Sequence, residues 1–191
     1  MRHLFLLAAL FCACISYAQI RVQERLPKSK TGFALTTAKT RAKIYYDVND
    51  ALVIKRSAEL FARDIQMVTG QKPELIQKRE RAKALVIVGT IEKNQWICEL
   101  AQKGKIDIRP LQGAWERYLI QTVDNPSPGV AKALVIAGSD RRGAAYGLFS
   151  ISEMMGVSPW YWWGDVPVKT HKALYVDAPP TYSKTPSVKY R

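Results

Sequence analysis

Apolar residues in this chain follow two patterns, uninterrupted runs and stripes at helical spacing. The runs at residues 84–88 and 133–137 contain no polar side chain, which predicts strands buried on both faces. The stretch that ends at Thr69 differs, because its apolar residues return every three or four positions and predict an amphipathic helix with Gly70 as its C-cap. The residues near that predicted face are Val53, Ala58, Phe61, Ile65 and Val68.

The same criteria place the remaining elements and the fold class. Strands are expected over residues 38–46, 74–77 and 116–123, and further helices between Thr90 and Gly104 and over residues 141–155. Because helices alternate with buried strands, the class is α/β. The hairpin-like order in the middle of the chain favours a mixed central sheet with about three helices.

One stretch of sequence occurs almost twice. Residues 82–90 read AKALVIVGT and residues 131–139 read AKALVIAGS. Each copy is a buried strand, a glycine and a hydroxyl residue expected to cap the next helix. Convergence on one efficient strand-to-helix unit is a simpler origin than duplication.

The chain begins with a basic start, Met1–His3, an apolar run over residues 4–15 and a small-x-small site at Ser16–Ala18. This order is typical of a secretory signal peptide over residues 1–18, so we expect a secreted or periplasmic protein. Acylation at Cys14, as in a lipoprotein, is less favoured.

Three further segments are expected in the mature chain. A polar leader spans residues 19–35, an α/β domain residues 36–178 and a linker residues 179–191. The tail from Pro159 has no helical period and is expected to be extended around Val166 and over residues 173–176.

Charge and cysteine content limit the partners. A formal net charge of +13 favours polyanions such as uronic-acid polysaccharides, anionic lipid head groups or nucleic acid, and a solvated surface without a specific partner is the simpler alternative. Export argues against nucleic acid, and no internal apolar run is long enough to span a membrane. After the signal peptide the chain has one cysteine, Cys98, and one histidine, His171, so we expect no disulfide, metal or cofactor. Cys98 is expected to be a buried small hydrophobic residue.

The run GSDRRG at residues 138–143 follows a strand and opens a helix. Free N–H groups at a helix start can bind anions, and Arg141 and Arg142 add bidentate recognition of carboxylates. The alternative is that Ser139 or Asp140 caps the helix while an arginine pairs with a nearby acid. The run matches neither a dinucleotide-binding fingerprint nor a P-loop.

Three tryptophans follow that helix, at Trp160, Trp162 and Trp163. They can stack on sugar rings or pack against a neighbouring domain, and the sequence favours neither. With Asp140, Arg141 and Arg142 they are the candidate substrate-binding residues.

No catalytic residue is assigned from the spacing of acidic side chains. Asp140, Glu116, Glu153 and Asp165 are the acids available near this region, and nothing in their spacing implies the pair that a glycosidase needs.

The run GSDRRGAAYGLFSISEMMGVSPWYWWGDVPV at residues 138–168 resembles the end of the N-terminal domain of family 115 glycoside hydrolases, the xylan α-glucuronidases. AELFARDIQMVTG at residues 58–70 resembles the first helix of the same domain. Family 67 α-glucuronidases and some hexosaminidases share the Arg-Gly…Tyr-Gly helix start, whereas Pro-Trp-Tyr-Trp-Trp points to family 115. The resemblance covers residues 36–191, nearly all of the mature chain.

The resemblance implies an accessory α/β domain of an enzyme that removes glucuronic acid or 4-O-methylglucuronic acid from xylan. In that family a TIM barrel after this domain carries the catalytic carboxylates, so the chain by itself is expected to be inactive, with the missing barrel and glucuronoxylan as partners. A non-catalytic module that binds acidic polysaccharide through Arg141, Arg142 and the tryptophans is the alternative. A decayed gene product is the third possibility.

Overall fold

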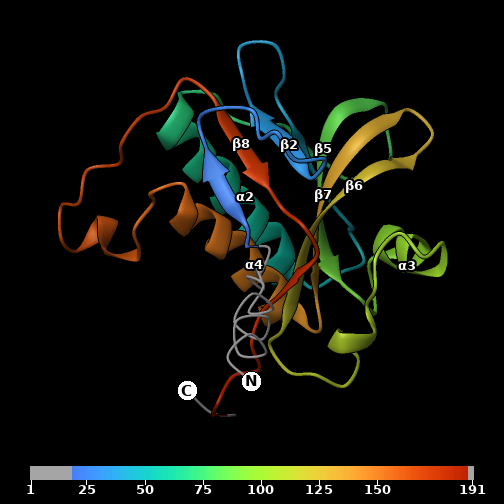
Figure 1. Cartoon of the computed structure of the whole chain (residues 1–191). Helices are drawn as coiled ribbons and strands as arrows, with labels where there is room; N and C mark the ends of the chain where they lie inside the picture. Colours follow the sequence, from blue (N-terminus) through green and yellow to red (C-terminus); the bar gives the residue numbers. More distant parts are fainter. Residues whose placement is uncertain (1–18, 189–191) are drawn as a thin grey trace, which may run out of the picture.

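The computed structural model describes residues 19–188, and of Trp162 it describes the backbone only. The signal peptide expected over residues 1–18 and the end of the expected linker, residues 189–191, lie outside the described residues. Within them the chain forms two sheets and three α-helices (Figure 1).

The central sheet has six strands in the order β4-β3-β5-β7-β6-β9. Its strands are β3 (Lys43–Tyr46), β4 (Leu75–Ile76), β5 (Ala82–Thr90), β6 (Tyr118–Ser127), β7 (Val130–Gly138) and β9 (Thr181–Tyr182). β4, β3, β5 and β7 run parallel, whereas β6 is antiparallel to both of its neighbours, β7 and β9. The expected mixed α/β sheet is therefore confirmed. The two near-identical segments supply β5 and β7, which pair side by side at its centre.

Helices cover both faces of this sheet. α2 (Leu52–Thr69) and α4 (Arg141–Met154) lie on one face, and α3 (Gln95–Gln102) lies on the other (Figure 1). Successive residues of β5 alternate between two cores, as strand geometry requires: Val86 packs with α2 and α4, and Ile87 packs with α3. Gly70 ends α2 in the left-handed conformation at φ 71°, as predicted.

A second, three-stranded sheet packs on the side of α2 and α4. Its order is β1 (Arg21–Gln23), β8 (Leu174–Asp177) and β2 (Gly32–Thr36), and all its pairs are antiparallel. Phe33 and Leu35 of β2 are fully buried in the same core as the two helices. The interpretation of residues 19–35 as a polar leader outside the domain is therefore wrong.

Several expected boundaries also differ. The strand expected over residues 38–46 starts only at Lys43. The strand expected to end at residue 123 continues as β6 to Ser127, with an irregularity in its pairing with β7. No strand forms around Val166, and residues 159–162 form a 3₁₀ turn, η2. β9 lies inside the expected linker and pairs with β6. A hydrogen bond of 2.9 Å from the Ser183 N–H to the Tyr118 carbonyl continues that pairing.

None of the helices among residues 19–188 is long and apolar enough to cross a membrane.

Candidate functional site

The turn before α4 is held by the side chain of Asp140, the N-cap of that helix. Its Oδ1 accepts hydrogen bonds from the N–H groups of Arg142 at 2.9 Å and Gly143 at 2.8 Å. Its Oδ2 accepts one from the N–H of Glu116 at 2.7 Å. The capping alternative is thus confirmed, because two of the N–H groups that an anion would need are already bonded to a carboxylate.

The two arginines of this turn have different surroundings. Nη1 of Arg142 lies 3.0 Å from Oε1 of Glu116, whose side chain is buried, and this hydrogen bond raises the pKa of Arg142 above its usual value. Arg141 is exposed, and its side chain makes no ion pair with any residue in the described range. Of the two, Arg141 is the better placed to meet an external carboxylate.

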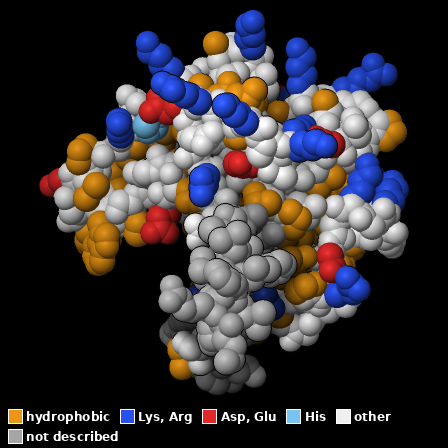
Figure 2. Space-filling view, viewed as in Figure 1, with side chains coloured by type: hydrophobic (Ala, Val, Ile, Leu, Met, Phe, Trp, Pro, Cys, Tyr) orange, Lys and Arg blue, Asp and Glu red, His pale blue; other side chains and the backbone are white. Residues whose placement is uncertain are grey.

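The tryptophan segment projects from the body of the protein after α4. Its 3₁₀ turn, η2 (Pro159–Trp162), starts at Ser158, whose Oγ accepts a hydrogen bond from the N–H of Trp160 at 3.1 Å. The side chains of Trp160 and Trp163 are 66% and 84% exposed, and hydrophobic side chains gather on this projection at the left of Figure 2. These two rings therefore form an exposed apolar surface. The side chain of Trp162 lies outside the description.

A groove of about 420 Å³ is lined by residues of α2, of α4 and of the segment that follows α4. Its aromatic lining comes from Tyr118, Tyr146, Phe149 and Tyr161. Asp64 of α2 also lines it, is buried, and accepts a hydrogen bond from Ser152 Oγ at 2.7 Å. Burial raises the pKa of this carboxyl, an effect that the bond from Ser152 partly opposes.

Sequence reasoning missed Asp64 as a residue of interest. The available signal was its position: it lies three residues after Phe61 and four before Val68, on the predicted apolar face of the helix. A carboxylate at such a place is buried and needs a partner, which here is Ser152.

A second polar cluster lies at the carboxyl ends of β3 and β5, where α2 and α3 leave for opposite faces. Open α/β sheets commonly bind ligands at such a point. Here Asp50 Oδ2 accepts the N–H of Thr90 at 2.7 Å, and Asp47 Oδ2 accepts the N–H of Gln95 at 3.4 Å. A Cβ at Gly89 would lie 2.8 Å from Asp50 Oδ2, so this carboxylate is in close contact with the end of β5.

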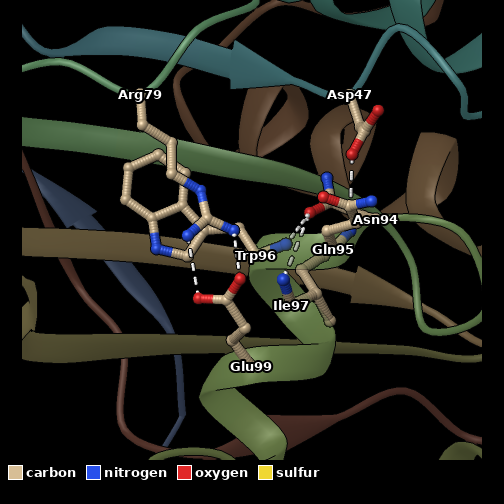
Figure 3. Close-up of polar contacts among 7 residues, drawn as sticks. All are labelled: Asp47, Arg79, Asn94, Gln95, Trp96, Ile97 and Glu99. Atoms are coloured by element: carbon tan, nitrogen blue, oxygen red, sulfur yellow. Dashed lines mark hydrogen bonds and ion pairs between the residues drawn. The ribbon is translucent and has the colours of Figure 1, made fainter.

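Figure 3 shows how this cluster fixes α3. Asn94, which was not the predicted cap, accepts the N–H groups of Trp96 and Ile97 at 3.1 Å each. Arg79 lies 4.9 Å above the ring centre of Trp96 and forms two hydrogen bonds with Glu99, at 2.8 and 2.7 Å. These contacts join the segment between β4 and β5 to α3. Asp47 and Asp50 also line a small cavity of about 280 Å³.

The remaining candidate acids lie in three different environments. Glu116 is buried at φ 52° against Arg142, Glu153 is exposed on α4, and Asp165 is exposed at φ 47° in a turn. No group of three or more His, Cys, Asp or Glu side chains among residues 19–188 could hold a metal ion. Cys98 is half-buried, its Sγ donates to the Ile91 carbonyl at 3.2 Å, and burial raises its pKa.

Comparison with known proteins gives structural matches only. No protein-family model and no curated protein matches the sequence. A solved family 115 4-O-methyl-α-glucuronidase, described as specific for decorated arabinogalactans, superposes with a TM-score of 0.64 and 29% identity. The match covers 83% of this chain and 19% of that one, so this chain spans about a fifth of the solved enzyme.

Other glycoside hydrolases match more distantly. A family 20 β-N-acetylhexosaminidase from Streptomyces coelicolor A3(2) has a TM-score of 0.44 and 14% identity, over 91% of this chain and 26% of that one. The stronger match supports a family 115-like domain, related in structure to part of a glycoside hydrolase.

Proposed function

We propose that this chain is the accessory N-terminal domain of a secreted glycoside hydrolase that removes glucuronic acid or 4-O-methylglucuronic acid from xylan. The observation that carries the proposal is the match to the 4-O-methyl-α-glucuronidase, which combines a TM-score of 0.64 with 29% identity. Because the aligned part is 19% of that enzyme, we propose that bond cleavage is performed by a catalytic barrel outside this chain.

The side chains in the described range support a non-catalytic role. Asp140 caps α4, Glu116 is paired with Arg142, and Asp47 and Asp50 hold the α3 region. Each of these carboxylates already serves the fold. Asp47 and Asp50, which line a common cavity, are bonded to main-chain N–H groups at the start of the α3 region. Trp160 and Trp163 instead offer exposed apolar surface that a catalytic barrel can cover.

Two experiments test this proposal. The purified protein is incubated with glucuronoxylan and with uronate-decorated arabinogalactan, and we expect no release of glucuronic acid. Turnover by this chain alone would overturn the accessory role.

The second experiment tests association with a catalytic domain. The catalytic part of a family 115 enzyme is produced without its leading domain, and we expect it to bind this chain. Trp163→Ala should weaken that binding, whereas Lys93→Ala, an exposed residue far along the sequence from the tryptophans, should not.

The DNA after codon 191 provides an independent test. An open or frameshifted reading frame that encodes a barrel supports the proposal, and its absence favours a separate module or a decayed gene. Secretion is also part of the proposal, and fusion of residues 1–18 to a reporter enzyme should direct its export.

A second candidate function is a free-standing module for acidic polysaccharide. The 84% exposure of Trp163 and the exposed Arg141 favour it, with Asp140, Arg142, Trp160 and Trp162 as the other candidate contacts. Salt-sensitive binding to glucuronoxylan that is weakened by Arg141→Ala and Trp163→Ala would support this function. If both variants still bind glucuronoxylan as the unmodified protein does, this surface is excluded as the binding site.

A further inference from the structure

A wide groove lies at the end of the central sheet where β5 and β7 begin. Its volume is about 730 Å³, and its walls are the start of β5, the residues after α3 and the β6–β7 hairpin. β7 runs from this groove at Val130 to the arginine turn at Gly138, so the two places are separated by about 26 Å of extended strand. The groove is therefore a surface distinct from the turn and the tryptophans.

All the charged side chains that line this groove are positive. They are Arg81, Lys83, Lys103 and Lys105, and no Asp or Glu is among the lining residues. Figure 2 shows Lys and Arg side chains along the upper and right margins of the molecule, on the side of this hairpin. Four like charges around one concavity create a positive potential that attracts anions.

The acids near these cations along the chain pair with other residues. Glu80 lies 2.7 Å from Lys43, and Asp107 lies 2.7 Å from Arg109. Glu99 is bonded to Arg79, which is the main cause of its lowered pKa, and Lys103 adds only a smaller effect. Asp124 lies 3.1 Å from Lys132, which is not a lining residue. None of the ion pairs within residues 19–188 includes any of the four lining cations, so their charges are available to an external anion.

The floor of the groove is apolar and its frame is firmly held. Pro126, Pro128 and Val130 line it between the cations. The N–H of Ala82 donates to the Gly129 carbonyl at 3.0 Å, and a Cβ at Gly129 would lie 2.8 Å from Arg81 Cγ, so hairpin and β5 are in close contact. Lys105 Nζ also donates to the carbonyl of Asn125, which ties the segment after α3 to the hairpin.

We propose that this basic groove binds a segment of uronic-acid-bearing polysaccharide. The carboxylates of the polymer pair with the lysines, while the apolar face of a sugar ring lies on Pro128, the exposed proline of the hairpin. The preference for a polyanion rests on the groove itself; the choice of a carbohydrate rests on the proposed function. The groove would hold the protein on its polymer at a place remote from the arginine turn.

The test uses the full chain and two variants of equal net charge. Lys83→Gln/Lys103→Gln/Lys105→Gln removes charge from the groove, and Lys28→Gln/Lys93→Gln/Lys169→Gln removes it from exposed lysines outside the groove. Probes are 4-O-methylglucuronate-bearing xylo-oligosaccharides, neutral xylo-oligosaccharides of the same length and single-stranded DNA. We expect the groove variant to bind the acidic oligosaccharide about tenfold more weakly, and the control variant to stay within about twofold.

Binding should also weaken as salt is raised from about 0.05 M to about 0.3 M, and neutral oligosaccharide should not bind. Backbone NMR of the unmodified protein provides a readout that needs no variant, since shifts on titration should concentrate at residues 103–105 and 125–131. Equal loss in both variants, shifts elsewhere, no binding at all, or tighter binding of DNA would overturn the proposal. If this chain still binds the catalytic part of a family 115 enzyme, only the proposal about the groove is refuted and the proposed function stands.

Discussion

Replacing Gly143 by alanine tests whether the start of α4 is locked against the preceding chain segment. A Cβ at this position would lie 2.2 Å from the carbonyl oxygen and 3.0 Å from the carbonyl carbon of Arg117, whereas ordinary contacts begin at 3.4 Å. Because both atoms belong to the main chain, no side-chain rotation can relieve the overlap. The segment at Glu116–Arg117 must move by about 1 Å.

Three hydrogen bonds oppose that movement. They join the Glu116 N–H to Asp140 Oδ2 at 2.7 Å, the Arg117 N–H to Ser139 Oγ at 3.0 Å, and the Ser139 N–H to the Arg117 carbonyl at 2.8 Å. Loss of two such bonds costs about 2–3 kcal/mol, and alanine in place of glycine in a helix returns about 1 kcal/mol. We therefore expect Gly143→Ala to lower the free energy of unfolding by about 1–2 kcal/mol.

Urea denaturation followed by circular dichroism measures this change. Ser150→Ala, on the same helix, is the control for helix propensity and should be neutral or slightly stabilising. The reasoning is refuted if Gly143→Ala is as stable as the unmodified protein, because the helical gain would then be realised without cost at the turn.

Three further predictions concern titration and exposed surface. Burial raises the pKa of Asp64 above its ordinary 3.8, so the fold favours the protonated carboxyl. The free energy of unfolding of the unmodified protein, relative to that of Asp64→Asn, should be greatest below about pH 4 and decline as the pH rises through the folded pKa. A difference that does not change with pH would contradict this. Hydrogen bonds from Arg109 lower the pKa of Asp107 to about 2, and in Arg109→Ala an NMR titration of this carboxyl should move toward 3.8; an unmoved titration would show that Arg109 is not the cause. Trp163→Ser should reduce the binding of a hydrophobic fluorescent dye, because this ring is 84% exposed, and weak dye binding before substitution would count against an uncovered patch.

The elements foreseen from the sequence are those whose signal is contained in one continuous stretch. β5 and β7 are uninterrupted apolar runs, and α2 has a full amphipathic period with a glycine at its end. The capping role of Asp140 was foreseen as an alternative because an N-cap acts within three residues.

The elements that were missed depend on partners far along the chain. β1 has only three residues and exists because Arg21–Gln23 pairs with β8, some 150 positions later. β9 is shorter still and is placed by β6. No local period can mark such strands, because what stabilises them is an edge that forms only when the rest of the domain has folded.

The prediction of site residues from the sequence was limited in the same way. The sequence singled out the arginines because two stand together, but it did not show that Arg142 is paired with Glu116 while Arg141 is exposed. Likewise the four cations of the basic groove come from two segments, residues 81–83 and 103–105, and only the β6–β7 hairpin completes one concave surface with them. Net charge predicted a preference for polyanions without placing it.

The two ends of the parallel strands explain where a ligand can bind on this domain. At the carboxyl ends of β3 and β5, the usual ligand position of such sheets, Asp47 and Asp50 already accept the N–H groups of the next loop, and this negative charge would repel an acidic sugar. At the opposite end the chain provides positive charge that no acid within the described residues pairs with. A polyanion is therefore attracted to the start of β5 and not to the carboxyl ends of β3 and β5. This is the physical reason for testing Lys83 before Asp47 or Asp50.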